Sequence, residues 1–243
     1  MKKLSTFSLF LLSLTVVFSG TVTLDSSGFS YKIGYYQTTS TNQDCYLKKT
    51  SPANESIWEK LYDSSPVDCK GLVVSFDNYN NKIWAAFSVD GGSYDSGYIT
   101  KKEIAASALE NVIFSSYGRG GGPKVSFISR INPLTGVIEK ATFLLARTSE
   151  GNINAVSKTN TLVVKDINAR NDGVFVAVDS YYMPPSEESA RNNFLFLANA
   201  TAENKFGRGS WRVLYLLSFE LDKIIKARVA NPQNNEPVDG IPF

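Results

Sequence analysis

The sequence predicts a mainly β protein that contains two tandem four-stranded repeats with a period of about 89 residues. Two similar loops, residues 117–120 (Tyr-Gly-Arg-Gly) and 206–209 (Phe-Gly-Arg-Gly), stand 89 positions apart. Val-Asp at 89–90 recurs at 178–179 with the same offset, and Leu-Val-Val at 72–74 recurs at 162–164. Three matches at nearly one spacing indicate an internal duplication. The high content of aromatic residues and glycine favours strands and tight turns over helices.

The N-terminus has the features of a secretory signal peptide. Lys2 and Lys3 precede an apolar stretch that runs to Phe18, and the small residues Ser19 and Gly20 follow. The stretch is shorter than the about 18 apolar residues that a membrane span needs, and serines interrupt it. We expect residues 1–20 to be removed and the mature chain to be secreted or periplasmic, without a stable membrane anchor.

Composition excludes several functional classes. The leader holds two of the 25 basic residues, so 23 basic and 23 acidic residues remain after cleavage. A neutral protein lacks the positive footprint of a nucleic-acid-binding protein. The chain contains no histidine, which excludes Ser–His–Asp and Cys–His catalysis and His-ligated zinc. We therefore expect no cofactor and no nucleic-acid partner.

Residues 21–70 are expected to form a strand and a helix that a disulfide brackets. Apolar residues alternate with polar ones over 29–37, as in a half-buried strand. Ser51-Pro52 is typical of a helix start, and apolar residues follow at helical spacing at 57, 58, 61 and 62. Cys45 and Cys69 are expected to pair in an oxidising compartment, closing a loop worth roughly 3 kcal/mol. Two free thiols are the alternative, which export disfavours.

The first repeat is expected over residues 71–158 and the second over 159–230. Each contains two hairpins separated by an insertion, residues 91–123 in the first repeat and 181–210 in the second. A capping box at residues 100–103 predicts a second short helix inside the first insertion. Residues 231–243 form a polar, proline-rich tail, which we expect to be flexible. The expected strands are 72–76, 83–89, 125–131, 137–145, 161–165, 174–178, 213–219 and 224–229.

The two repeats resemble the four-stranded blade of β-propeller repeats in exported bacterial proteins. The resemblance rests on the strand ends at Asp90 and Asp179 and on the turn at residues 132–136 (Asn-Pro-Leu-Thr-Gly), and it covers roughly 71–145 and 160–230. The bacterial proteins in question are uncharacterised, so the resemblance implies a fold but no function and no site residue. Two blades cannot close a propeller, which has about four to eight. The repeats are therefore expected to form one sandwich-, barrel- or partial-propeller-like domain, or to close by oligomerisation.

The insertions supply the candidate binding residues. If a pseudo-twofold axis relates the repeats, Arg119 and Arg208 could flank one cleft and grip a carboxylate or sulfate. Alternatively, each arginine stacks on its own neighbour, Tyr117 or Phe206, and the glycines only make the turn. Further candidates are aromatic residues that could stack on a sugar: Tyr94, Tyr181 and Tyr182.

Asp90 and Asp95 form a weaker candidate, for calcium, because carboxylates and hydroxyls surround flexible glycines in residues 90–95. The corresponding part of the second repeat has Asp179 but lacks the second carboxylate, which favours a polar turn. Residues 118–124 are rich in glycine but lack the residues that a phosphate-binding loop requires.

The leading hypothesis is an exported, non-enzymatic, β-rich binding or scaffold protein whose ligand, a glycan or a protein, binds the insertions. One alternative is a carbohydrate-active hydrolase that uses a carboxylate pair, drawn from Asp90, Asp95, Glu187 and Glu188. Another alternative is a structural envelope component that assembles by strand pairing between subunits.

Overall fold

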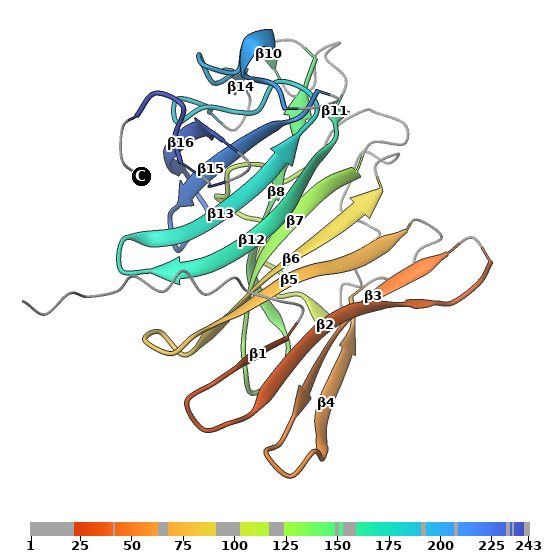
Figure 1. Cartoon of the computed structure of the whole chain (residues 1–243). Coiled ribbons are helices and arrows are strands. Elements are labelled where there is room, and N and C mark those ends of the chain that lie inside the picture. The colour runs from red at the N-terminus through yellow and green to blue at the C-terminus, as the bar shows by residue number, and fades with distance from the viewer. Residues whose placement is uncertain are drawn as a thin grey trace, which may run out of the picture.

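The computed structural model describes residues 22–40, 42–62, 68–90, 103–116, 124–148, 151–152, 159–190, 193–206, 209–231, 234 and 236–240. The prediction of a mainly β protein is confirmed (Figure 1). In this part of the chain the helical residues are all of the 3-10 type, the turn η2 (Ala202–Asn204) and Glu103, and no helix could span a membrane. The expected signal peptide, residues 1–20, lies outside the described residues.

The first sheet consists of β1 (Val22–Leu24), β2 (Ser30–Gln37), β3 (Gln43–Thr50) and β4 (Ser56–Leu61), antiparallel and in chain order. β2 alternates as the sequence predicts, with Tyr31 and Ile33 buried and Lys32 exposed. The chain therefore forms a third four-stranded sheet, which precedes the two expected repeats in the sequence.

The helix predicted over residues 51–62 is wrong, because this segment is a turn followed by β4. Ser51 uses its backbone N–H to bind Glu55 O at 2.8 Å, and its hydroxyl accepts the N–H of Glu55 at 3.1 Å. Asn54 adopts a left-handed conformation with φ of 64°. The Ser51-Pro52 segment, which is typical of a helix start, therefore forms the turn of the hairpin between β3 and β4. A bulge at Ile57 in β4 shifts the strand register and disguises its alternation.

The second sheet contains β5 (Cys69–Asp77), β6 (Lys82–Asp90), β7 (Lys124–Ile131) and β8 (Ile138–Leu144). The third sheet contains β12 (Leu162–Arg170), β13 (Gly173–Ser180), β15 (Trp211–Leu217) and β16 (Ile224–Ala230). Each is an open antiparallel meander, and the strands lie where the two expected repeats place them. Two pairs of short strands lie outside these sheets: β9 (Ala146–Arg147) with β11 (Thr159–Asn160), and β10 (Gly151–Asn152) with β14 (Asn193–Phe194) of the second insertion.

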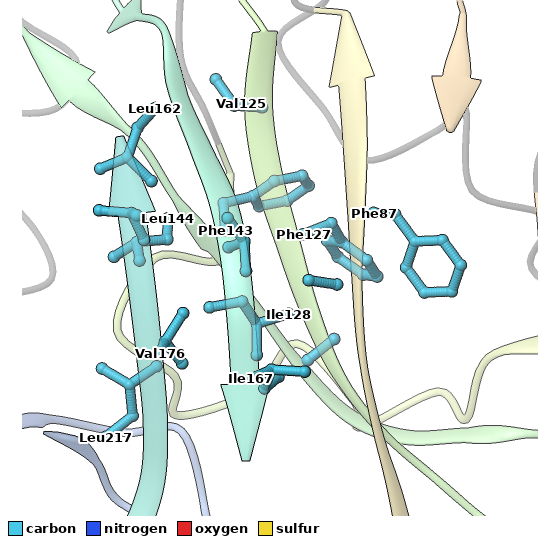
Figure 2. Packing of buried hydrophobic residues seen from close by; sticks show 14 of the residues in the cluster. Phe87, Val125, Phe127, Ile128, Phe143, Leu144, Leu162, Ile167, Val176 and Leu217 are labelled. Carbon is cyan, nitrogen blue, oxygen red and sulfur yellow. The ribbon is translucent and has the colours of Figure 1, made fainter. Parts of the chain in front are cut away.

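The three sheets pack on one another in chain order, as in a sandwich or a partial propeller, and none closes into a barrel within the described residues (Figure 1). β5 contacts β2 and β3 of the first sheet and β12 of the third. Figure 2 shows the core between the second and third sheets, where Ile128 and Leu144 lie near Val176 and Leu217.

The predicted disulfide is confirmed. Cys45 on β3 and Cys69 on β5 are bonded and fully buried. The bond therefore joins the first sheet to the second, next to the contact between β5 and β2.

The second predicted helix is also wrong within the described residues 103–116, which run as turns along the outer edge of β8. Ala105 donates its N–H to Ile138 O at 2.8 Å, and Phe114 O accepts the N–H of Phe143 at 3.0 Å. An edge strand offers a row of unpaired backbone groups. Those of β8 bind this segment and hold it out of a helix.

Candidate functional site

The end of the first insertion and the start of the second are both hydrogen-bonded to one residue, Thr161. Lys124, which follows the first insertion, donates its backbone N–H to Thr161 Oγ1 at 3.2 Å. Tyr181, which opens the second insertion, donates its N–H to Thr161 O, also at 3.2 Å. The insertions therefore leave the second and third sheets at the same end of the molecule, which we call the insertion end.

A buried stack of side chains fastens this end together. Phe114 from the first insertion and Phe194 from the second are stacked, with ring centroids 4.4 Å apart and an interplanar angle of 8°. The guanidinium carbon of Arg147, in the segment between the sheets, lies 5.0 Å from the centroid of Phe194. All three side chains are almost completely buried. The stack ties three separate chain segments into one scaffold.

Sequence reasoning missed Arg147, whose burial lowers its pKa to about 10. A sequence signal was present, because the arginine directly follows an apolar run at residues 143–146. In the structure it is the second residue of β9. A charged residue that follows an apolar run either ends a strand at the solvent or lies buried as a cation. In the structure, Arg147 is fully buried.

Three consecutive residues at the start of the second insertion combine a fixed backbone with exposed side chains. Tyr181 N–H binds Thr161 O, the hydroxyl of Ser180 donates to Tyr182 O, and Met183 O accepts the N–H of Arg147 at 3.1 Å. Their exposed fractions are nevertheless 49% for Tyr181, 44% for Tyr182 and 39% for Met183. We call these three residues the tyrosine surface.

The second glycine-arginine loop is a tight turn, and only part of it is described. Phe206 donates its N–H to Ser210 O at 2.7 Å, and Gly209 donates to Phe206 O at 2.9 Å. Gly209 has a φ of 102°, which explains the glycine, because side chains rarely tolerate that conformation. Phe206 is half-buried. The other candidates of this kind lie outside the described residues: Tyr94, Tyr117, Arg119 and Arg208. The shared arginine cleft stays a prediction.

The carboxylate of Asp179, near the end of β13 and just before the second insertion, is engaged in ion pairs. Asp179 pairs in register with Arg212, and at the equivalent place in the second sheet the backbone of Asp90 pairs with that of Lys124. The carboxylate of Asp179 lies 2.6 Å from Arg212 Nε and 3.6 Å from Lys165 Nζ. Two cations thus neutralise it, which is the environment of an ion pair and not of a metal ligand.

The structure describes only part of the calcium candidate, because Asp95 lies outside the described residues. The calcium site therefore stays a prediction. Among the residues that the structure does describe, no three or more Asp, Glu, His or Cys side chains gather in a way that could hold a metal.

Of the four carboxylates in the hydrolase hypothesis, the structure describes the side chains of Glu187 and Glu188. Glu187 Oε1 accepts the backbone N–H of Ala227 at 2.8 Å and forms an ion pair with Arg228. It therefore anchors the second insertion to the edge of β16. Glu188 is exposed.

No protein-family model matches this chain, and no curated protein matches it either. The function of this chain is therefore inferred from the geometry of the insertion end.

This end offers two kinds of contact. The tyrosine rings provide flat apolar faces with a hydroxyl at the tip, and the methionine provides a flexible apolar edge. Such a surface suits stacking and hydrogen bonding to a ligand rather than bond cleavage.

Proposed function

We propose that this chain is an exported binding protein whose ligand, a glycan or a protein, contacts the tyrosine surface. The observation that carries the proposal is the combination of fixed backbone and exposed side chains at three consecutive residues, Tyr181, Tyr182 and Met183. Binding is weakened by every group that must be ordered when the ligand arrives. A backbone that is already hydrogen-bonded to the scaffold reduces this cost.

Tyrosine is well suited to this role. Its ring supplies a large contact area while only two side-chain torsions need to be fixed, and its hydroxyl can donate or accept a hydrogen bond. A sugar ring presents an apolar face edged by hydroxyls, so it can use both properties at once. A protein loop can use the same properties, which is why both ligand classes belong to the proposal.

The engagement of Glu187 supports binding over hydrolysis. Glycoside hydrolysis needs one carboxyl group that can give up a proton and a second that faces the sugar. Glu187 already binds a backbone N–H and a guanidinium group. Withdrawing it from them would detach the second insertion from β16.

Export is supported by the chemistry of the cysteines and of the N-terminus. The buried Cys45–Cys69 bond suits an oxidising compartment. The leader-like residues 1–20 would direct the chain there.

The test is binding of the purified product of the full chain to a broad glycan array. The double variant Tyr181→Ala/Tyr182→Ala is compared with Tyr79→Ala, a matched control that removes a tyrosine with 90% exposure from the turn between β5 and β6. That turn lies at the opposite end of the second sheet. We expect the double variant to lose at least about tenfold in affinity, as for removal of a central aromatic contact, and the control to bind normally.

Glycan binding that survives the double substitution would reject the tyrosine surface. Silence of the wild-type protein would reject a glycan ligand. The protein form of the proposal is then tested by placing a photo-crosslinking residue at Tyr182 and, as control, at Tyr79 in the exporting cell. Crosslinks that appear equally at both positions, or at neither, would reject that form too.

A further inference from the structure

The last strand of the third sheet, β16, lies at the edge of that sheet away from β12 (Figure 1). One side of β16 pairs with β15 along its whole length. The other side of an edge strand presents a row of backbone N–H and C=O groups, to which a strand of another chain can add. At β16, groups on this outer side bind two other segments of the same chain, the C-terminal residues 236–240 and Glu187.

The C-terminal segment follows the outer side of β16 in the antiparallel sense. An antiparallel bridge joins Ala230 to Pro237. Next to it, Val238 donates its N–H to Val229 O at 2.9 Å. Just past the end of β16, the N–H of Asn231 binds the carbonyl oxygen of residue 236 at 2.8 Å. These three contacts share one register, so residues 236–240 cover the end of the strand edge.

Pro237 lets this segment cover β16 without offering a new donor at its own position. Val229 turns its C=O toward the segment, so the next residue, Ala230, turns its backbone groups toward β15, because these directions alternate along an antiparallel strand. The backbone of Pro237, opposite Ala230, therefore points away from β16. Proline has no N–H there, which makes it suitable at an outermost position.

The second part of the cover is a single side chain from the second insertion. Glu187 Oε1 accepts the N–H of Ala227 at 2.8 Å, two positions before Val229 and on the same side of the strand. Arg228, which lies between these two strand residues, forms an ion pair with Glu187, and its Nε lies 3.7 Å from Asp239 Oδ2. One guanidinium group therefore holds both parts of the cover on β16.

The second sheet closes its corresponding edge with a segment of the chain as well. Its fourth strand, β8, binds residues 103–116, in which Ala105 donates its N–H to Ile138 O at 2.8 Å. β8 and β16 are the fourth strands of equivalent four-stranded meanders. Both fourth strands are thus covered on their outer side, which is how proteins prevent pairing between sheet edges.

We propose that residues 236–240 and Glu187 form an edge cap, held by Arg228, that keeps β16 from pairing with β16 of a second copy of this chain. Two such strands can pair antiparallel about a twofold axis at Val229, because the outward backbone groups of residues 227, 229 and 231 then meet those of 231, 229 and 227. Arg228 is then opposite Ala230, so no like charges face each other. The proposal does not rest on the ligand of the tyrosine surface.

The test is sedimentation velocity of the purified protein from about 1 to about 300 μM. The uncapped variant lacks residues 236–243 and carries Glu187→Ala, which removes both parts of the edge cap. Its matched control lacks only residues 241–243 and carries Glu188→Ala, a change to the neighbouring exposed carboxylate. Near-ultraviolet circular dichroism checks that both variants are folded.

Arg228→Gln tests whether the guanidinium group holds the edge cap, because it leaves every backbone group in place. Its control is Lys223→Gln, which removes a positive charge from an exposed residue just before β16. We expect Arg228→Gln to associate more tightly than Lys223→Gln and less tightly than the uncapped variant. Equal association of the two charge variants would overturn the role of Arg228.

We expect the uncapped variant to associate at least about fivefold more tightly than its control, the size of about one hydrogen bond. Amide hydrogen exchange shows whether the edge is involved, because the N–H of Asn231 should exchange more slowly in the associated uncapped protein than in its monomer. The proposal is overturned if the folded uncapped variant associates no more than its control. It is equally overturned if association leaves the exchange of Asn231 unchanged.

Discussion

Gly71→Ala should weaken the packing of the first sheet on the second and lower the free energy of unfolding. Gly71 lies on β5 where the strand passes β2 most closely. A Cβ atom added there would stand 2.3 Å from Ile33 Cγ1, 2.7 Å from Gly34 N and 2.8 Å from Gly34 O. Two of these atoms belong to the backbone of β2, so a side-chain rotation cannot remove the clash.

The size of the effect follows from how far β2 must move. Restoring an ordinary contact of 3.4 Å to Gly34 N requires a shift of about 0.7 Å, and a gap of that size forfeits roughly a quarter to a half of each dispersion contact across it. Overpacking of a core typically costs about 1–3 kcal/mol. Alanine returns about 0.4–1 kcal/mol by restricting the unfolded chain. Because the obstacle is backbone, we expect a net loss of about 2 kcal/mol.

Gly34→Ala is the matched control for this substitution. A Cβ at Gly34 would meet only the ring tip of Tyr46, at 2.8–2.9 Å, on the outer face of the same sheet. A ring at the surface can swing aside, so we expect a loss below about 1 kcal/mol. Urea unfolding followed by tryptophan fluorescence gives both free energies of unfolding. Equal values for the two variants would refute the close approach of β5 to β2.

Two further predictions concern the first sheet. Cys45→Ala/Cys69→Ala opens a loop with a sequence separation of 24 and should lower the free energy of unfolding by about 3–4 kcal/mol; urea unfolding with no measurable loss would show that the bond does not restrict the unfolded chain. The hydrogen bond from the Tyr36 hydroxyl to Glu59 raises the pKa of Tyr36 to about 12, so its contribution is complete below the usual tyrosine pKa and disappears as the pH rises through about 12. The difference in stability between the wild type and Tyr36→Phe should therefore shrink between pH 9 and pH 12, and a constant difference would contradict this account.

The sequence predicts those segments that have a strong local pattern of apolar residues and whose backbone groups do not bind the open edge of a neighbouring strand. The eight strands of the second and third sheets alternate or are continuously apolar, and they lie near the expected positions. The disulfide follows from cysteine count and compartment alone. Both helix predictions fail for one physical reason. Residues 56–61 and 103–116 each satisfy their backbone groups on a neighbouring strand, which local spacing cannot reveal.

The candidate site likewise has a part that the sequence predicts and a part that it does not. The sequence singles out Tyr181 and Tyr182 as aromatic residues directly after a strand, and the structure shows both side chains exposed, while their role in binding stays a prediction. The contact between Arg147 and Phe194 was not predictable, since it depends on two segments 47 positions apart in the chain that meet only after the sheets pack. The short strand pairs β9–β11 and β10–β14 that bring them together contain two residues each. Such short pairs carry almost no sequence pattern.

The first sheet is attached to the second through its inner face. The Cys45–Cys69 bond and the close packing at Gly71 both act on the inner face, where Tyr31, Ile33 and Leu47 are buried. The outer-face side chains of Leu24 and Leu61, which are 59% and 44% exposed, therefore contribute little to holding the sheet in place. Leu24→Ala should therefore leave the free energy of unfolding nearly unchanged, whereas Gly71→Ala should lower it by about 2 kcal/mol.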